Sequence, residues 1–239
     1  MTKTKVGALV ALAAAAVIGA IVYYKPGVFS KTDVVVSETR APAREPLPAA
    51  HPTVNTRGLA GWHLDYGQNV IHRFTVVAPP GHDLSLGGFS FKVDLKLPAG
   101  FTVTHPYLTG ANTSGTFTMD TSCGFPADPS HLCARVPFMS ELVIPKGTAM
   151  DFMLLSNVNS PRGLTGLVTG NSISVTLLAD YAANGALSGS GKSFGIGGKL
   201  QNMVWSDISA SPHSLTSADW WSGFYATGLP LGPLTISRL

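Results

Sequence analysis

Residues 84–97, LSLGGFSFKVDLKL, alternate apolar and polar side chains, and this period of two limits the fold more than any other feature of the chain. Phe89, Phe91 and Val93 alternate here with polar residues such as Lys92. Side chains of a β-strand point alternately to its two faces. The pattern therefore predicts a strand that buries one face and exposes the other.

Similar apolar runs recur along the chain and are separated by turn residues rather than by helices. Further strands are predicted at 70–77, 101–104, 115–119, 134–144, 149–155, 171–180 and 200–205. Pro137 suggests that the strand at 134–144 lies at a sheet edge. The chain has 26 Gly and 17 Pro, which disfavour helix interiors. We predict an all-β fold, a single antiparallel β-sandwich of Ig-like or jelly-roll-like type.

An uncharged stretch at residues 6–24, VGALVALAAAAVIGAIVYY, lies between Lys3 and Lys5 on one side and Lys25 on the other. Nineteen helical residues would span about 28 Å, close to the hydrocarbon thickness of a bilayer. The tyrosines at its end, followed by a lysine, suit the membrane interface. We predict an N-terminal transmembrane helix, an uncleaved signal-anchor in the cell membrane with the rest of the chain outside.

Two alternatives for this stretch remain open. A cleaved signal peptide would place Ala20 before the cut, although Ile18 does not suit an A-x-A site. A pilin-like leader cut after Gly7 would leave a helix for a filament core. Type IV pilins carry Glu at the fifth mature position, where this chain has Leu12.

The chain divides into three predicted parts. Residues 1–29 form the membrane anchor, residues 30–60 contain a first strand at 33–38 and a Pro-rich linker, and residues 61–239 form the extracytoplasmic β domain. The linker has four prolines in residues 40–52, a composition that favours extended polyproline II. We prefer to interpret it as an ordered loop lying along the sandwich.

The net charge of +3 belongs to the flanks of the apolar stretch. Apart from Lys3, Lys5 and Lys25, the chain has 13 Lys+Arg against 13 Asp+Glu. A domain with balanced charge lacks the basic face that binds nucleic acid, so no nucleic-acid partner is expected.

Cys123 and Cys133 enclose a loop that contains Gly and Pro. In a chain directed across a membrane, this spacing predicts a disulfide. Closing a loop of this size stabilises a fold by about 2–3 kcal/mol in the chain-entropy model. A metal site of Cys123, His131 and Cys133 would lack a fourth ligand, and reduced thiols are the other alternative.

Two short segments match the residue pattern of a nucleotide-binding or hydrolase motif but lack the structural context that the motif requires. Residues 186–193 fit a relaxed P-loop, and 191–195 fit G-x-S-x-G, but glycines follow where both motifs require a helix. The seven histidines form no metal-binding grouping. We expect no enzymatic activity, no cofactor and no resident metal.

Aromatic residues gather near the C-terminus, at Trp205, Trp220, Trp221, Phe224 and Tyr225. Large rings beside strands usually belong to the core. The alternative is a carbohydrate-binding module in which Trp220, Trp221 and Tyr225 stack on a glycan.

The chain resembles a known group of proteins at residues 70–78, 84–93, 143–148 and 173–176, and most closely at VWSDISASPHS (204–214) with Asp219 and Trp220. It resembles the surface β-sandwich modules of predicted envelope proteins from ultrasmall candidate-phylum bacteria (Patescibacteria), which end in a similar W-S-D…H-S…D-W signature. The resemblance covers roughly residues 68–230. It implies a surface-exposed structural or adhesive module and no catalytic residues.

Together these features predict a membrane-anchored, cell-surface structural or adhesive protein, a possible subunit of a surface assembly. Its expected partners are the membrane, through residues 6–24, and other copies of the chain, other surface proteins or a glycan. A pilin-like filament subunit is the alternative.

Overall fold

The computed structural model describes residues 48–111, 113–114, 116–118, 131–161, 167–180, 201–214 and 217–239. Residues 44–239 form one compact unit, distinct from residues 1–43. The predicted anchor at 6–24, the strand at 33–38 and Cys123 lie outside the described residues. Within the described part, no helix has the length and apolar character needed to cross a membrane.

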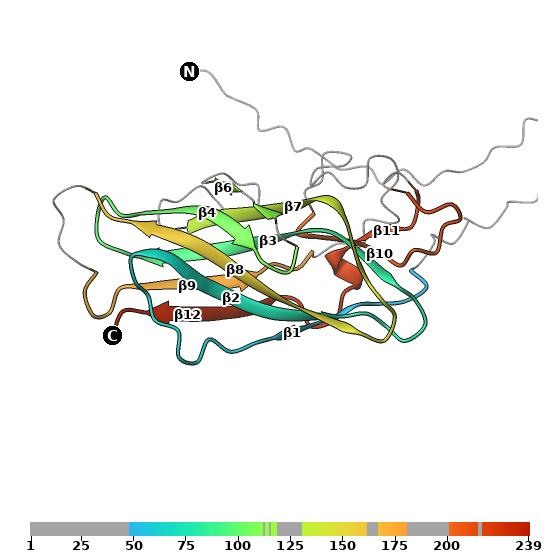
Figure 1. The fold of residues 1–239 in the computed structure, drawn as a ribbon, viewed down its shortest axis with the longest axis horizontal. Coiled ribbons are helices and arrows are strands. Elements are labelled where there is room, and N and C mark those ends of the chain that lie inside the picture. Colours follow the sequence, from blue (N-terminus) through green and yellow to red (C-terminus); the bar gives the residue numbers. More distant parts are fainter. Residues whose placement is uncertain are drawn as a thin grey trace, which may run out of the picture. The chain divides into compact units, whose positions relative to one another are not determined.

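The described residues form an all-β fold of antiparallel sheets (Figure 1), which confirms the predicted class. The strands are β1 (Thr53–Thr56), β2 (Gly67–Val77), β3 (Leu84–Lys96), β4 (Thr102–Leu108), β5 (Thr113–Ser114), β6 (Thr116–Thr118), β7 (His131–Ile144), β8 (Ala149–Asn159), β9 (Ser172–Leu177), β10 (Met203–Ser206), β11 (Trp220–Ser222) and β12 (Leu231–Ser237). A 3₁₀ helix, η3 (Gly223–Tyr225), follows β11, and the described residues contain no α-helix.

Four of these strands, β1, β5, β11 and β12, have no counterpart among the predicted ones. β1 lies inside the segment predicted as strand and linker, where Val54 pairs with Val76 of β2. The compact unit therefore begins before the predicted boundary at residue 61, because β1 completes an edge of its first sheet.

The strands pair into two sheets. The first has the order β1-β2-β8-β4-β5, and the second has the order β11-β10-β3-β7-β6, with β9 and β12 attached through β3. The long strand β3 is divided between two neighbours on one side, because its residues 85–89 pair with β10 and 91–96 pair with β9. The predicted edge position of β7 is wrong, since β7 has β3 on one side and β6 on the other.

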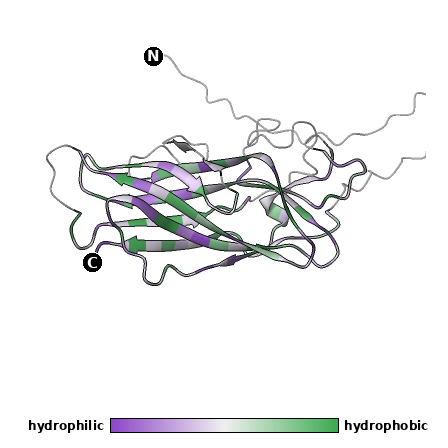
Figure 2. Cartoon of the chain, in the orientation of Figure 1, coloured by the Kyte–Doolittle hydropathy of each residue, from purple (hydrophilic) through white to green (hydrophobic). Residues whose placement is uncertain are grey.

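One apolar core receives side chains from both sheets. Phe74 of β2 stacks on Phe152 of β8 with ring centroids 5.1 Å apart, and Phe89 of β3 meets Phe74 edge-on at 5.0 Å. Offset-stacked and edge-to-face pairs are the arrangements that aromatic rings prefer. Along β2 and β8, polar and apolar residues succeed one another as in half-buried strands (Figure 2).

The first half of β3 departs from the predicted one-sided burial. Residues 84–91 are all buried, whereas the polar side chains of 92–96 are at least partly exposed. The second face is covered where β10 and β11 approach, since a Cβ atom at Gly87 would lie 2.9 Å from Val204 Cγ1 and 3.3 Å from Trp220 Cζ3. Only glycine, which has no Cβ atom, leaves room at position 87 for the Val204 and Trp220 side chains.

Candidate functional site

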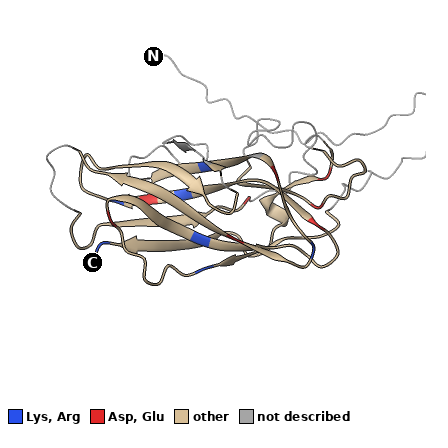
Figure 3. Ribbon diagram, in the orientation of Figure 1, with Lys and Arg blue, Asp and Glu red and all other residues tan. Residues whose placement is uncertain are grey.

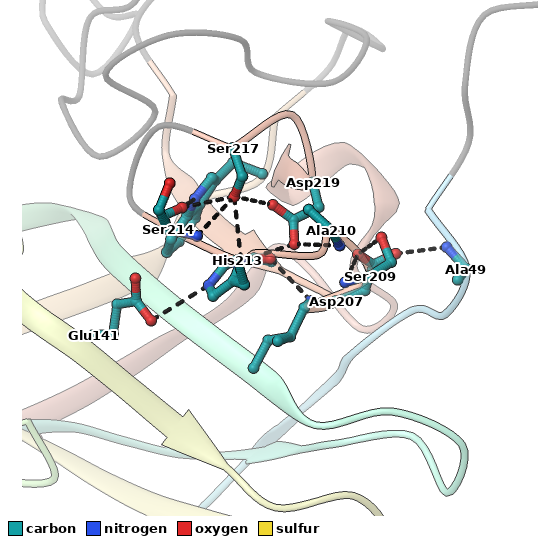
Figure 4. A network of polar contacts seen from close by, with 12 residues as sticks. Ala49, Glu141, Asp207, Ser209, Ala210, His213, Ser214, Ser217 and Asp219 are labelled. Atoms are coloured by element: carbon teal, nitrogen blue, oxygen red, sulfur yellow. Dashed lines mark hydrogen bonds and ion pairs between the residues drawn. The ribbon is translucent and has the colours of Figure 1, made fainter.

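A group of polar side chains lies where the loop between β10 and β11 meets β7 (Figure 4). We call Glu141, His213, Ser217 and Asp219 the His213 cluster. His213 and Ser217 belong to the loop, Asp219 directly precedes β11, and Glu141 belongs to β7. Because β10 and β7 lie on opposite sides of β3, the cluster joins two strands that do not pair with each other.

Glu141 lies on an irregular stretch of β7. Gly88 and Leu86 are two residues apart on β3, but their partners Pro137 and Leu142 are five residues apart on β7. Such a bulge bends a strand and re-aims its side chains. It brings the Glu141 carboxylate toward the β10–β11 loop.

His213 is held at both ring nitrogens. Its Nδ1 atom lies 2.8 Å from Asp219 Oδ2, and its Nε2 atom lies 3.3 Å from Glu141 Oε2, in an ion-pair geometry rather than a hydrogen bond. The imidazole ring also packs on the Trp220 indole, with centroids 5.6 Å apart. The side chains of His213 and Asp219 are only 13% and 3% exposed, so these contacts are largely removed from water.

Asp219 is the acceptor that organises the loop. It accepts a hydrogen bond from Ala210 N at 3.1 Å, and it also contacts His213 and the Ser217 hydroxyl. Burial acts to raise the pKa of the Asp219 carboxyl, but the hydrogen bonds from Ser217, Ala210 and His213 outweigh it. The pKa of Asp219 therefore lies below its ordinary value.

Ser217, His213 and Asp219 are the residue types of a hydrolytic triad, but their arrangement differs from one. In a triad, the serine and the acid face different nitrogens of the histidine ring. Here Ser217 Oγ lies 3.3 Å from Nδ1, the nitrogen that also faces Asp219, and its single proton has two acceptors within reach, the Asp219 carboxylate and Ser214 O at 2.7 Å. An Nδ1–H that donates to Asp219 has no lone pair to accept the serine proton. The His213 cluster therefore contains no activated nucleophile.

Other residues of the W-S-D…H-S…D-W signature fold the same region. Trp205 Nε1 donates to Ser222 O at 2.9 Å, which joins β10 to β11. Trp220 Nε1 donates to Ser214 O at 2.9 Å, which holds the loop over the ring. These hydrogen bonds give the two tryptophans of the signature a structural role, because each buried indole N–H is paired with a backbone carbonyl.

The N-terminal end of the described chain is bound to this region. Ala49 N donates to Asp207 Oδ2 at 2.6 Å, and His51 Nδ1 lies 2.9 Å from Tyr225 O. Residues 48–52 of the Pro-rich segment thus contact the β domain, whereas residues 40–47 lie outside the described residues, so the predicted ordered loop over 40–52 stays a prediction.

A second buried carboxylate, Asp180, follows β9. Its oxygens accept hydrogen bonds from the backbone N–H groups of Asn202 at 2.8 Å, Met203 at 3.3 Å and Gly223 at 2.8 Å. Burial raises the pKa of Asp180, with these N–H groups and the nearby Arg135 opposing it. Asp180 thus links the ends of β9, β10 and β11, which is a structural role.

The structure buries two of the three residues predicted as a glycan platform. Trp220 and Trp221 are 0% and 3% exposed. Adjacent strand residues point to opposite faces, so Trp221 enters the core and Trp220 packs with Val204 on the other face. Tyr225 is half-buried against Trp221, with ring centroids 5.6 Å apart. A stacking platform on the two indoles is therefore wrong for this structure.

Exposed aromatic rings lie elsewhere. Trp62 is 43% and Tyr66 is 40% exposed, in the segment between β1 and β2 that we call the Trp62 loop (residues 57–66). Phe224 of η3 is 45% exposed. Trp62 and Tyr66 were not among the predicted site residues, although their setting among Gly, His, Asp and Gln is a composition typical of an exposed loop.

The predicted cysteine chemistry stays a prediction. Cys133 is buried in β7, and its predicted partner Cys123 lies outside the described residues. His131 of the alternative metal site forms an ion pair with Asp94 at 2.9 Å. In the described part of the chain, no three His, Cys, Asp or Glu side chains are placed to hold a metal ion.

Comparison with known proteins assigns no family. No protein-family model matches the chain, and no curated protein matches its sequence.

Proposed function

We propose that this chain is a cell-surface structural or adhesive protein, anchored in the membrane by residues 6–24 and displaying one antiparallel β-sandwich outside the cell. Two sheets that contribute to one aromatic core support the sandwich arrangement. The resemblance of the C-terminal signature to envelope modules supports the surface location.

The observation that carries the proposal is the separation of the chain entry from the exposed aromatic loop. Thr53 pairs with Val77 at one end of β2, and Tyr66 directly precedes Gly67 at the other end. The 11 residues of β2 extend over about 36 Å at the usual rise of a strand. Figure 1 shows the same separation along β2.

This separation suits a tethered binding module. The described chain enters the β domain at the Thr53 end of β2, so the rings at the Tyr66 end are separated from the chain entry. Loops that are held on a rigid scaffold commonly carry binding residues. Figure 3 shows charges of both signs scattered over the strands, and a domain with balanced charge does not strongly repel other copies.

The cellular location of the β domain tests the proposal. The full chain and a variant lacking residues 6–24 are expressed, and membranes are separated from soluble protein. We expect the full chain in the membrane fraction, with its β domain degraded by protease added to intact cells, and the variant outside that fraction. A soluble full chain, or a domain cut only after lysis, would contradict the proposal.

Electron microscopy of the purified full chain separates an anchor from a filament core. Dispersed particles in detergent support an anchor. Ordered filaments would instead assign residues 6–24 to helix packing between copies, for which its small residues are suited.

A further inference from the structure

We propose that the Trp62 loop and the first residues of β2 form a binding site for an uncharged glycan, with the rings of Trp62 and Tyr66 as its stacking surfaces. The inference rests on the proposed function, in which the β domain is displayed outside the cell. This site differs from the sugar site predicted from the sequence. It lies at the Tyr66 end of β2 and does not include the buried indoles of Trp220 and Trp221.

The backbone of the proposed site is fixed before any ligand binds. Leu64 is 0% exposed, and its N–H group donates to Ser237 O at 3.1 Å. Asn69 ties the following residues together, because its Oδ1 accepts from Asp65 N at 2.8 Å and its Nδ2 donates to Asp65 O at 2.8 Å and Gly67 O at 2.9 Å. A site that is ordered in advance loses less entropy on binding.

The two rings stay accessible on this fixed backbone. Tyr66 stacks on Phe101, with ring centroids 6.0 Å apart and an angle of 28° between the planes, and the residue is still 40% exposed. Phe101 therefore orients the Tyr66 ring without covering it. Trp62 is 43% exposed. Trp and Tyr offer large, rigid contact surfaces with few rotatable bonds, which makes them effective binding residues.

The residues around the rings favour a sugar over an apolar partner. Leu64 is the one buried residue in 60–68, and the exposed members include His63, Asp65 and Gln68. A pyranose presents a C–H face to an aromatic ring and hydroxyl groups at its edge, and these side chains supply donors and acceptors for the hydroxyls. An apolar protein partner would instead require a continuous apolar patch.

The local charge favours an uncharged ligand. Asp65 Oδ1 lies 3.1 Å from Arg238 Nη1, so the carboxylate and the guanidinium form a pair. Anionic lipids and acidic polysaccharides attract clusters of basic residues. The basic residue of the Trp62 loop, Arg57, is paired too, because its Nε atom lies 3.3 Å from Asp151 Oδ1.

The test uses the full chain solubilised in detergent, with chitohexaose, cellohexaose and maltohexaose as probes. Trp62 is the exposed member of the four tryptophans, since Trp205, Trp220 and Trp221 are buried. All four tryptophans fluoresce, but Trp62 is the one a ligand can reach from solvent, so a change in tryptophan fluorescence on adding a sugar is assigned to Trp62, and calorimetry gives the Kd. We expect at least one probe to bind, and Trp62→Ala and Tyr66→Ala each to weaken binding about tenfold or more.

Phe224→Ala is the matched control, because Phe224 is 45% exposed but belongs to η3, beside the chain entry. We expect this variant to bind the sugar as the parent does. Circular dichroism and the unfolding midpoint verify that all three variants are folded. Binding that survives Trp62→Ala, or is lost equally in Phe224→Ala, would overturn the inference.

The remaining outcomes separate this inference from the proposed function. If none of the three hexasaccharides binds, the inference is wrong, while a β domain exposed on intact cells keeps the proposed function. If the full chain dimerises with rising concentration and Trp62→Ala prevents this, the loop binds a second copy and the glycan inference is overturned. A domain located inside the cell would remove the proposed function, whatever the sugar result.

Discussion

His213 Nε2 lies 3.3 Å from Glu141 Oε2, so these two side chains connect the β10–β11 loop to the bulge of β7 across the intervening strand β3. Asp219 holds the other ring nitrogen of His213 at 2.8 Å. The loop fastened in this way carries Trp220 over Gly87, which explains why the first half of β3 is buried on both faces. The His213 cluster therefore closes one face of the second sheet.

Removing the Asp219 carboxylate should release this loop. Asp219→Ala leaves Ala210 N, Ser217 and His213 without their acceptor, and we expect a loss of roughly 1–3 kcal/mol in the free energy of unfolding. Urea unfolding measures the loss. Asp83→Ala is the control, because Asp83 is exposed and accepts one hydrogen bond from Lys146 N at 2.8 Å. Equal losses in the two variants would contradict the role given to Asp219.

The contact between Trp220 and β3 predicts a steric effect at Gly87. In Gly87→Ala, the new Cβ atom would lie 2.9 Å from Val204 Cγ1, so the Val204 side chain must shift. We expect destabilisation of about 1–3 kcal/mol, the usual cost of overpacking. Gly81→Ala is the matched control, since nothing lies within 4 Å of its Cβ position. Similar unfolding midpoints for Gly87→Ala and the parent would contradict this prediction, because the Val204 and Trp220 side chains would then move aside at little cost in free energy.

The strands predicted correctly from the sequence are those whose apolar and polar residues alternate within the strand itself. β2, β3 and β8 follow apolar periodicity that can be read within the segment itself. β12 was missed because Gly232 and Pro233 indicate a turn, whereas the structure accommodates them as a register shift between Leu231 and Leu234. Local patterns cannot distinguish these two uses of the same residues.

The candidate site was only partly predictable, for a similar reason. The signature contains His213 and Asp219, but the third charged group, Glu141, is brought in by a bulge that depends on pairing with β3. The tryptophan pair illustrates the same limit. Strand alternation places Trp220 and Trp221 on opposite faces, but the covering loop that buries Trp220 is a tertiary feature.

The predicted disulfide can be measured directly on the full chain. If Cys123 and Cys133 are joined, the intact chain is lighter by two hydrogens than the reduced chain. Reduction should also lower the stability by about 2–3 kcal/mol in the chain-entropy model. The control is Cys123→Ser with Cys133→Ser, whose mass and stability should not respond to the reductant. An unchanged mass of the parent on reduction would contradict the disulfide.

The most specific pH effect should come from His72. Its ring is 0% exposed and lies between Phe74 and Phe91, with centroids 5.9 Å and 5.8 Å away, and neither ring nitrogen makes a hydrogen bond of ordinary geometry within the described residues. Burial lowers the pKa of His72 to about 4, against a smaller opposing effect of the Leu231 backbone. Unfolded chains titrate their histidines near the ordinary value of 6.5.

Acidification should therefore destabilise the domain through this one residue. Below pH 6.5 the unfolded chain binds a proton at this position, and the folded chain does not until about pH 4. The free energy of unfolding should fall across that window by at most about 3.5 kcal/mol, since one pKa unit corresponds to about 1.4 kcal/mol. Urea unfolding of the parent and of His72→Leu at several pH values measures the difference. Because both proteins retain Asp180 and Asp219, that difference isolates His72, and parallel curves would mean that the histidine is protonated in the folded domain.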